Sequence, residues 1–516
     1  MQINRLKNQS ATKTAINPEG ALVVQDNLTR RLLLSSLSLN TRRSRSFYHT
    51  DEEAFQEFLG HIREGLEKDM LFTIASAVYL ARKGRRLAPV ITLTEAVMAG
   101  EGGEEERELL KRAMQPVFSD RPDKILTSLA HFQNERGKSF KGLPPYYKRQ
   151  LGRVLAGFRP LTLKKFRAEQ RAVSLADAIK ALRPKPATEE MGEFYRAIIE
   201  RRREAKLEAT EHVTATLSST ELTREKKEQV IRDSLETMPL KALIANIRQY
   251  ASMDAEVQAR LVKRFDSLLS NFDDEKVQKI FNICDLFIPK EALVTEELAE
   301  TVNRILQRAV QKYAYAFDPA KRYTVLQDLS GSMYGGGRFS IENPRITDSA
   351  RMLAVLYSLV PAEQIKVICF DTKHQELTDN FVTIAEQCKG EPLELFDRFY
   401  RLMSGPLRRG FCGGTSIVDT YTRNISGRED VVILNTDEVT WADNSPVEAI
   451  QQHIRRLNAT TDTVILNVAY TDGKVIADKK VIRIAGLDRF SFEMIGIFQG
   501  DVARIRQEII RAFTVT

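Results

Sequence analysis

The sequence predicts two architectures in one chain, a helical domain followed by an α/β domain with a doubly wound parallel sheet. Apolar residues recur at helical spacing through most of residues 26–317. Beyond Asp318-Pro319-Ala320, short β-branched runs alternate with amphipathic stretches, and several of these runs end in polar loops. Such alternation is typical of βαβ units with helices on both faces of a sheet. At 516 residues with 43% hydrophobic side chains, the chain is long enough for two or three domains.

The helical half is divided by regularly spaced breakers. Phe55, Phe58, Leu59 and Ile62 show the i, i+3, i+4 spacing of an amphipathic helix. Gly or Pro residues interrupt the pattern every ~15 to 25 residues, as expected of stacked helical pairs of the HEAT or armadillo kind. No strict sequence repeat accompanies them, so an irregular helical bundle is the alternative. Residues 1–25 are polar and contain Pro18 and Gly20, which predicts an extended arm, and the helical domain is expected over residues 26–318.

The α/β half, residues 319–516, is expected to contain five strands. The strand-like runs are Thr324–Leu326, Ile365–Phe370, Val431–Leu434, Val464–Val468 and Val481–Ile484. Amphipathic stretches such as Ser349–Leu359 and Val447–Leu457 stand between them and predict helices. In open α/β sheets, ligands bind at the carboxyl ends of strands, so the loops that follow these runs are the candidate site.

Three of these loops carry oxygen side chains. Asp328, Ser330 and Ser332 follow the first strand, Thr415 follows two glycines, and Asp437 follows the run Val431–Leu434. Hard oxygen ligands of this kind suit Mg²⁺ or another divalent cation. The order Asp-x-Ser-x-Ser, Thr, Asp resembles the metal-ion-dependent adhesion site of von Willebrand factor A domains. That resemblance implies direct ligands from the three hydroxyls, with the carboxylates acting directly or through water. The alternative is an α/β domain whose polar loops hold no metal.

The positive charge is concentrated in the helical half. The chain has a net charge of +8, and Lys124–Lys185 alone contains 15 Lys/Arg against 3 acidic residues. A field of this strength favours a polyanion as partner. Aromatic residues are interleaved with the charges, and the cluster as a whole favours stacking on bases, whereas any single aromatic is more often helix core. They are Phe132, Phe140, Tyr146, Tyr147, Phe158 and Phe166.

Nucleic-acid binding is therefore predicted along this stretch, with a smaller basic cluster earlier in the chain. Lys164, Arg167 and Arg171 share one helix face by their spacing. The candidate RNA-binding residues are Arg42, Arg43, Arg45, Arg136, Lys138, Lys141, Lys148, Arg149, Arg153, Lys164, Lys165, Arg167, Arg171, Lys180 and Arg183.

Other classes of protein are disfavoured. No apolar run reaches membrane-spanning length, and the first residues carry no signal-type hydrophobic segment, so a cytoplasmic protein is expected. Four scattered cysteines and six scattered histidines predict neither disulfides nor a zinc site. The basic half holds no dense carboxylate cluster and no recognisable nucleophile–base pair, so we expect no enzyme.

Taken together, the two halves resemble the Ro autoantigen family, in which a TROVE domain of helical repeats precedes a von Willebrand factor A domain. Met238-Pro239-Leu240-Lys241-Ala242-Leu243-Ile244 is similar to a segment near the end of the family's TROVE domain. Pro319-Ala320-Lys321-Arg322-Tyr323 leads into the Asp328 loop as in the family, and Thr436-Asp437-Glu438 also matches. Arg183 stands where the family has a histidine, and Arg43-Ser44-Arg45-Ser46 replaces a glycine-rich stretch.

The resemblance implies a non-enzymatic RNA-binding scaffold. It implies a monomeric ring of helices, closed by the A domain, whose hole takes single-stranded ends of misfolded RNA. A basic outer face would take a small structured noncoding RNA of the Y type. Bacterial relatives work with exoribonucleases such as polynucleotide phosphorylase. The main alternative is an A-domain partner subunit of a MoxR-type ATPase that acts by metal-dependent protein contact. A metal-dependent enzyme acting on phosphoesters is a weaker one, because the site is rich in hydroxyls.

Overall fold

The computed structural model describes two compact units. The helical unit comprises residues 1–40, 55–231 and 502–516, and the sheet unit comprises residues 41–54 and 232–501. Both ends of the chain therefore belong to one unit. The residues described are 14–16, 22–24, 51–100, 103–137, 140–166, 172–202, 223–238, 243, 247, 250, 253–270, 283–287, 293, 295–334, 344–411, 413–437, 447–457, 461–467, 481–485, 487, 491–492, 494–495 and 502–514.

Helices make up nearly all the described part of the helical unit, as the sequence predicts. They are α3 (Asp51–Arg82), α4 (Leu87–Ala99), α5 (Glu104–Phe118), α6 (Pro122–Arg136), α7 (Pro145–Ala156), α8 (Pro160–Lys164), α9 (Leu175–Leu182), α10 (Glu189–Ile199) and α25 (Val502–Thr514). A further helix, α12 (Arg224–Ser234), crosses the division between the units. In the N-terminal arm, β1 (Thr14–Ile16) and β2 (Leu22–Val24) pair antiparallel, a pairing that the polar composition did not predict. No described helix is long and apolar enough to cross a bilayer.

The C-terminal helix α25 is held at a break in α3. Asp69 leaves helical geometry (φ −156°, ψ 74°) and caps the second half of α3 by accepting a hydrogen bond from the Phe72 amide. Its other carboxylate oxygen forms an ion pair with Arg506 of α25. At the far end of α25, Arg112 donates to the carbonyl oxygens of Phe513 (2.9 Å) and Thr514 (3.0 Å). A cation at a helix C-terminus is electrostatically favourable, so both ends of this helix contribute to its docking.

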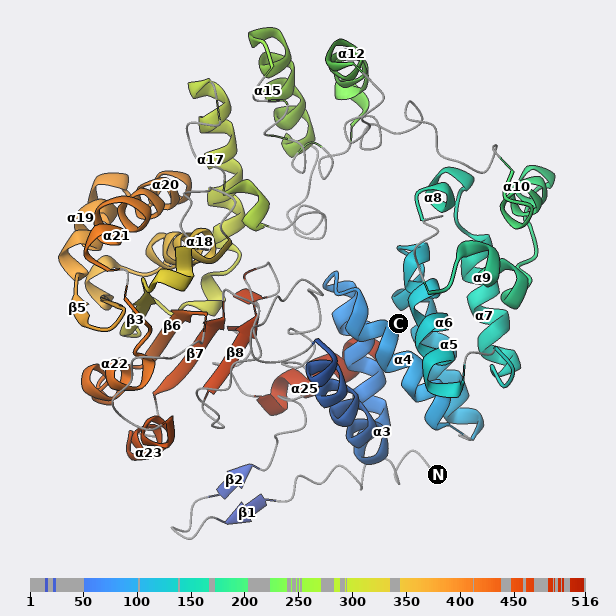
Figure 1. The fold of residues 1–516 in the computed structure, drawn as a ribbon, viewed down its shortest axis with the longest axis horizontal. Coiled ribbons are helices and arrows are strands. Elements are labelled where there is room, and N and C mark those ends of the chain that lie inside the picture. The colour runs from blue at the N-terminus through green and yellow to red at the C-terminus, as the bar shows by residue number, and fades with distance from the viewer. Residues whose placement is uncertain are drawn as a thin grey trace. The chain divides into compact units, whose positions relative to one another are not determined.

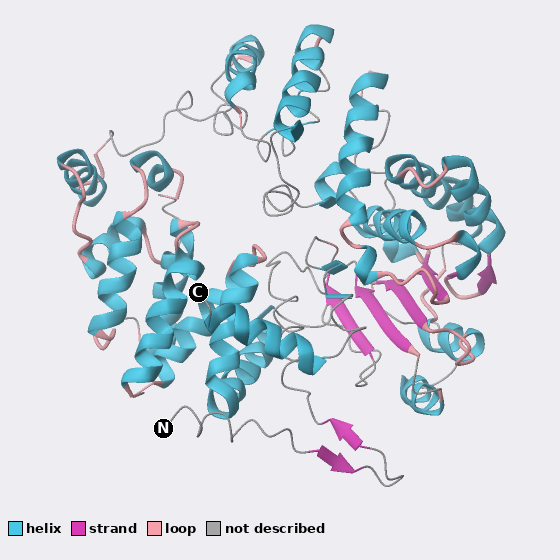
Figure 2. Ribbon diagram, turned by 180° about the vertical axis from the view of Figure 1, so that it is seen from behind, coloured by secondary structure: helices cyan, strands magenta, loops and turns pink. Residues whose placement is uncertain are grey.

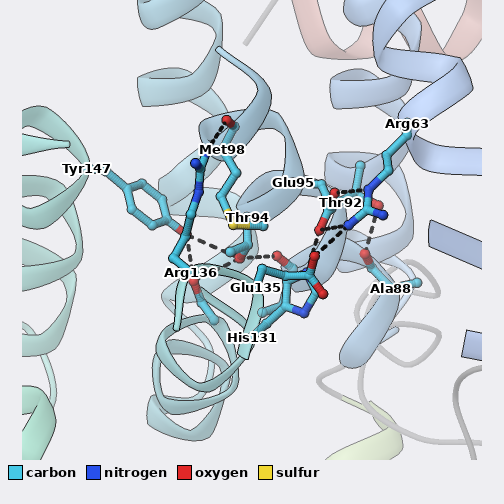
Figure 3. A network of polar contacts seen from close by, with 12 residues as sticks. Arg63, Ala88, Thr92, Thr94, Glu95, Met98, His131, Glu135, Arg136 and Tyr147 are labelled. Carbon is cyan, nitrogen blue, oxygen red and sulfur yellow. Dashed lines mark hydrogen bonds and ion pairs between the residues drawn. The ribbon is translucent and has the colours of Figure 1, made fainter. Parts of the chain in front are cut away.

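A buried polar network joins α4 and α6 side by side (Figure 3). Glu95 Oε1 lies 2.7 Å from His131 Nε2, and Arg63 of α3 donates to Glu95 Oε2 at 2.7 Å. Thr94 and Ser128 are hydrogen-bonded at 2.8 Å, and Ser128 meets the Tyr147 hydroxyl at 2.7 Å. These pairs advance in the same direction along both helices, so α4 and α6 run parallel.

Glu95 makes the helical unit sensitive to acid. Burial raises the pKa of Glu95, but the hydrogen bonds and charges of His131 and Arg63 outweigh it and hold the pKa below its usual value. A carboxyl group with a depressed pKa stabilises the fold above its unfolded pKa and loses that contribution as pH falls through the folded value.

Glu95→Gln is therefore expected to lower the free energy of unfolding by about 2 kcal/mol at neutral pH, because it weakens a buried charged network. The deficit relative to wild type should shrink as pH falls below the ordinary glutamate range. Thermal melts from pH 7 to pH 3 measure both effects. Glu135→Gln is the matched control, since Glu135 also binds Arg63 but is 31% exposed. An equal, pH-independent loss in both variants would contradict the assignment.

The sheet unit is built on a six-stranded sheet of order β5-β4-β3-β6-β7-β8. All strands are parallel except β5, which runs antiparallel to β4. The chain passes from β3 to β4 on one side and later to β6 on the other side of β3. The carboxyl ends of β3 and β6 therefore mark the topological switch point of a doubly wound sheet. The strands are β3 (Tyr323–Asp328), β4 (Ile365–Phe370), β5 (His374–Glu376), β6 (Val431–Thr436), β7 (Asp462–Asn467) and β8 (Val481–Ala485). All five expected strands are present, and the short, polar β5 is the one that the sequence did not predict.

Helices cover both faces of this sheet (Figures 1 and 2). On one face, Leu326, Ile368, Leu434 and Ile465 form a buried cluster with residues of α22 and α23. On the other, the Gln327 side chain donates to the Ser349 hydroxyl of α18 at 3.1 Å. The principal helices are α15 (Ala255–Ser270), α17 (Glu296–Gln311), α18 (Pro344–Leu359), α19 (Thr378–Cys388), α20 (Pro392–Leu402), α22 (Ile417–Asn424) and α23 (Val447–Arg456).

The units divide at different residues from those that composition indicated. Residues 232–318 belong with the sheet rather than with the preceding helices, and α25 belongs with the helical unit. Helix α17 contacts both α18 and α20. The rings of Phe287 and Phe396 lie 5.4 Å apart, and those of Tyr313 and Phe492 lie 5.1 Å apart. These apolar contacts join residues on either side of Asp318. The boundary between the units therefore lies before Asp318, where the sequence pattern changes from helical to alternating.

Candidate functional site

Asp328 lies at the carboxyl end of β3 and is fully buried. Its Oδ1 accepts a hydrogen bond from the Ser330 amide at 2.8 Å, and its Oδ2 accepts one from the Thr436 hydroxyl at 2.7 Å. Burial and the nearby charge of Asp437 raise the pKa of Asp328 to about 7, although the bonds from Ser330 and Thr436 oppose this. Two carboxyl groups thus lie close together in a low-dielectric place, where a positive charge between or beside them is favourable.

The two serines lie in the loop that follows. Ser330 is buried, and its hydroxyl lies 3.1 Å from that of Ser332. Ser332 is the second residue of a short helical turn, Gly331–Tyr334. The amide of Gly331 donates to the carbonyl of Gly413 at 3.1 Å, so this loop is tied directly to the loop that carries Thr415. The buried hydroxyl of Thr415 is therefore held on the same side of the sheet as the serines.

Asp437 follows β6 and is also fully buried. Arg345, near the start of α18, donates from Nη1 to Asp437 Oδ2 at 3.0 Å and to the carbonyl oxygen of Ser332. Its side chain is 28% exposed, whereas that of Asp437 is 1% exposed. Arg345 therefore places a guanidinium at the mouth of the site, where it balances one of the two buried carboxylates.

A third carboxylate, Asp371, shapes the loop of Thr415. It follows β4 and is buried, and its Oδ2 accepts from the Gly413 amide at 2.9 Å. Its backbone carbonyl accepts from the Ser416 amide at 2.9 Å. Asp371 is not among the residues that the sequence pattern singled out, although it stands directly after the strand Ile365–Phe370, in a position like those of Asp328 and Asp437. Arg345 was also missed, because only the tertiary structure brings α18 to the end of β6.

The donor set is one of hydroxyls and carboxylates. Within the described ranges, no three His, Cys, Asp or Glu side chains gather as they would to hold a metal ion. Five oxygen-bearing side chains on three neighbouring loops include hydroxyls as well as carboxylates, and such oxygens suit a hard cation such as Mg²⁺. They are Asp328, Ser330, Ser332, Thr415 and Asp437.

The candidate RNA-binding residues are spread over several elements of the helical unit. Arg149 and Arg153 lie one turn apart on α7 and are exposed, while the neighbouring Lys148 is partly buried. Lys141, Lys165, Lys180 and Arg183 are exposed as well, and Lys164, the last residue of α8, is partly buried. Arg136 is exposed and donates to the Met98 carbonyl (Figure 3). Lys124, which opens the basic stretch, is 2% exposed and pairs with Asp120, so its charge is internally balanced.

Some of the candidates lie outside the described residues. They are Arg42, Arg43, Arg45, Lys138, Arg167 and Arg171. The proposed common face of Lys164, Arg167 and Arg171 is therefore a prediction from spacing only.

The interleaved aromatics divide into core and surface. Phe132, Tyr147 and Phe158 are buried. Phe140, Tyr146 and Phe166 are partly exposed, and Phe166 contacts the guanidinium of Arg121. Half of the set therefore forms helix core, the alternative that the sequence left open.

Comparisons with known proteins bear on the fold. No family model matches the sequence, and no curated protein matches it. Among solved structures, the chain is similar to the crystal structure of the Ro (RSR) protein of Deinococcus radiodurans, with a TM-score of 0.55 and 15% sequence identity. The match covers 92% of this chain and 98% of that one.

The chain has the fold of a Ro protein. The likeness extends over both units, so the Ro-like fold includes the helices and the sheet. It agrees with the resemblance in motifs at Met238 and around Asp328, although the sequences have diverged widely.

Gly413 offers a test of how the Thr415 loop is built. A Cβ at Gly413 would lie 2.8 Å from both Cγ2 and Oγ1 of Thr372 and 3.1 Å from Asp371 Oδ2. Gly413→Ala is therefore expected to lower the free energy of unfolding of the sheet unit by about 2 kcal/mol through steric overlap. Thermal or urea unfolding measures the loss.

Thr372→Ala removes both of the closest atoms and should restore part of that stability in the double variant. The double-mutant cycle isolates the coupling between the two positions. A double variant whose loss equals the sum of the single losses would show that the overlap with Thr372 is not the cause.

Proposed function

We propose that this chain is an RNA-binding scaffold of the Ro type. Three observations support the proposal: the Ro-like fold, the motifs shared with that family, and the exposed cations of the helical unit. In this proposal, a small structured noncoding RNA binds the basic surface, single-stranded ends of misfolded RNA enter a monomeric helical ring, and an exoribonuclease is the protein partner. The chain contributes binding and positioning rather than catalysis.

The exposed face of α7 is the best-defined candidate surface for RNA. Arg149 and Arg153 project from one side of the helix, and the opposite side is fixed in the core by Tyr147, Leu151 and Leu155. Cations held on a rigid helix form a defined surface for phosphate groups, which supply most of the affinity in RNA binding.

Replacing Arg149 and Arg153 together by Gln should flatten the plot of log K against log salt by about 1.4, because each phosphate contact contributes about 0.7 for single strands. Binding should weaken across sequences alike, since phosphate contacts carry no base information. Fluorescence anisotropy with a labelled single strand, at several salt concentrations, measures the slope.

Arg196→Gln with Arg201→Gln is a charge-matched control, because both arginines are exposed in the same unit. An equal loss in the control would assign the effect to bulk charge. Salt-insensitive or absent RNA binding by the wild type would refute the proposal and favour an A-domain subunit that acts by protein contact alone. Sequencing the RNA that copurifies with the protein would name the ligand.

We further propose that the oxygen cluster of the sheet unit is an adhesion-type site for Mg²⁺ or another divalent cation in a von Willebrand A domain. Ser330, Ser332 and Thr415 would be direct ligands, with Asp328 and Asp437 acting directly or through water. The raised pKa of Asp328 supports this, because it reflects two buried carboxyl groups in need of a compensating charge. When bound, the ion would offer an open coordination position to an acidic group of a partner.

Millimolar Mg²⁺ is expected to raise the melting temperature of the wild type but not of Asp328→Ala, in which the site loses half its carboxylate charge. The wild-type shift should decrease as pH falls below about 7, since the ion requires ionised Asp328. Asp379→Ala is a control, because Asp379 is an exposed carboxylate of the same unit. Equal shifts in wild type and Asp328→Ala would refute the metal assignment.

Arg345→Gln gives this experiment a second arm. Removing the guanidinium leaves Asp437 without that partner, so the variant should be less stable without Mg²⁺ and more strongly stabilised by it. A smaller Mg²⁺ shift than in the wild type would mean that Arg345 supports the ion instead of competing with it.

A further inference from the structure

Two arginines meet where α4 and α6 begin. Because these helices run parallel, with Thr94 beside Ser128 and Glu95 beside His131, their first residues lie at the same end. Arg86 precedes α4 and Arg121 precedes α6. Partial burial, and after it the charge of Arg121, lower the pKa of Arg86, whose side chain still reaches solvent, and this agrees with the placement of both arginines at one end of the helix pair.

The planar guanidinium of Arg121 is held in one orientation. Its Nε and Nη2 donate to the two carboxylate oxygens of Asp123, each at 2.9 Å, and this bidentate pairing sets the plane of the guanidinium. The same group lies over the Phe166 ring, 5.0 Å from its centre. The Arg121 side chain is 29% exposed, so the stack of ring and guanidinium reaches solvent.

Positive charge exceeds negative charge around this stack. Asp120 pairs with the buried Lys124, and Asp123 pairs with Arg121. Arg86 is exposed, and so is Lys165, which precedes Phe166. The positive ends of two helix dipoles add to the same field. A flat cationic surface beside a second arginine has the chemistry of a nucleotide site, in which phosphate meets the charges and a base stacks on the planar groups.

We propose that Arg86, Arg121 and Phe166 form a subsite for one nucleotide of single-stranded RNA. Arg86 and Arg121 bind its phosphate, and its base stacks on the exposed part of the Arg121–Phe166 platform. The inference rests on the proposed RNA-binding function and adds to it a place on α4, α6 and the end of α8 where a base is held, with two arginines that are not among the candidate RNA-binding residues.

Binding of a labelled oligouridylate, measured by anisotropy against salt, tests the subsite. Phe166→Leu should weaken binding about tenfold, the loss of one stacked base, without changing the salt slope. Arg121→Lys keeps the charge but removes the planar fork, and should behave like Phe166→Leu. Arg86→Gln should flatten the slope by about 0.7, the contribution of one phosphate contact. Arg196→Gln serves as the matched control, with no comparable loss expected.

Inorganic polyphosphate, a polyanion without bases, separates the two parts of the subsite. Arg86→Gln should weaken polyphosphate binding, whereas Phe166→Leu should leave it unchanged. If Phe166→Leu weakened both ligands equally, or weakened neither while melting like the wild type, the nucleotide subsite would be overturned and the RNA-binding function would stand. A wild type that binds no oligouridylate at any salt concentration would remove both proposals.

Discussion

The completely buried carboxylate of Asp328 organises the sheet unit, because a charged group in such a place must be satisfied by its surroundings. Hydrogen bonds from Ser330 and Thr436 join the end of β3 to the end of β6. The same loop reaches Gly413 through the Gly331 amide, and Asp371 fixes Gly413 from β4. Three strand ends are therefore held by carboxylates that accept hydrogen bonds from the neighbouring loops. This arrangement converts the switch point of a parallel sheet into a compact group of oxygen donors.

The helical unit also contains a buried carboxylate, that of Glu95, which must be satisfied by its neighbours. Glu95 is buried and lies between His131 and Arg63, which fixes the parallel course of α4 and α6. That course brings Arg86 and Arg121 together at one end, where neither helix begins with a side-chain cap. A network centred on the buried Glu95 and His131 thus determines which cations lie together on the surface.

The two units divide the chemistry of the chain. The helical unit carries the surplus of positive charge and presents it on α7, α8 and the starts of α4 and α6, which suits a polyanion. The sheet unit concentrates buried negative charge at one group of loops, and Arg345 partly balances it. In the proposed function, the helical unit would hold the nucleic acid and the sheet unit would hold a protein partner.

Local sequence was sufficient for five of the six strands in the sheet unit. The alternation of β-branched runs and amphipathic stretches predicted β3, β4, β6, β7 and β8, because parallel strands buried on both faces need continuous apolar residues. Polar residues after those runs made Asp328, Ser330, Ser332 and Asp437 candidate ligands, and a glycine loop added Thr415. Only the tertiary structure decided that Arg345 and Asp371 join them, that Lys124 is buried, and that residues 232–318 belong to the same compact unit as the sheet. It also placed Arg86 beside Arg121 and Phe166. These outcomes depend on contacts between residues far apart in the chain. A periodic pattern indicates which face of an element is apolar, but it does not indicate which other element packs against that face.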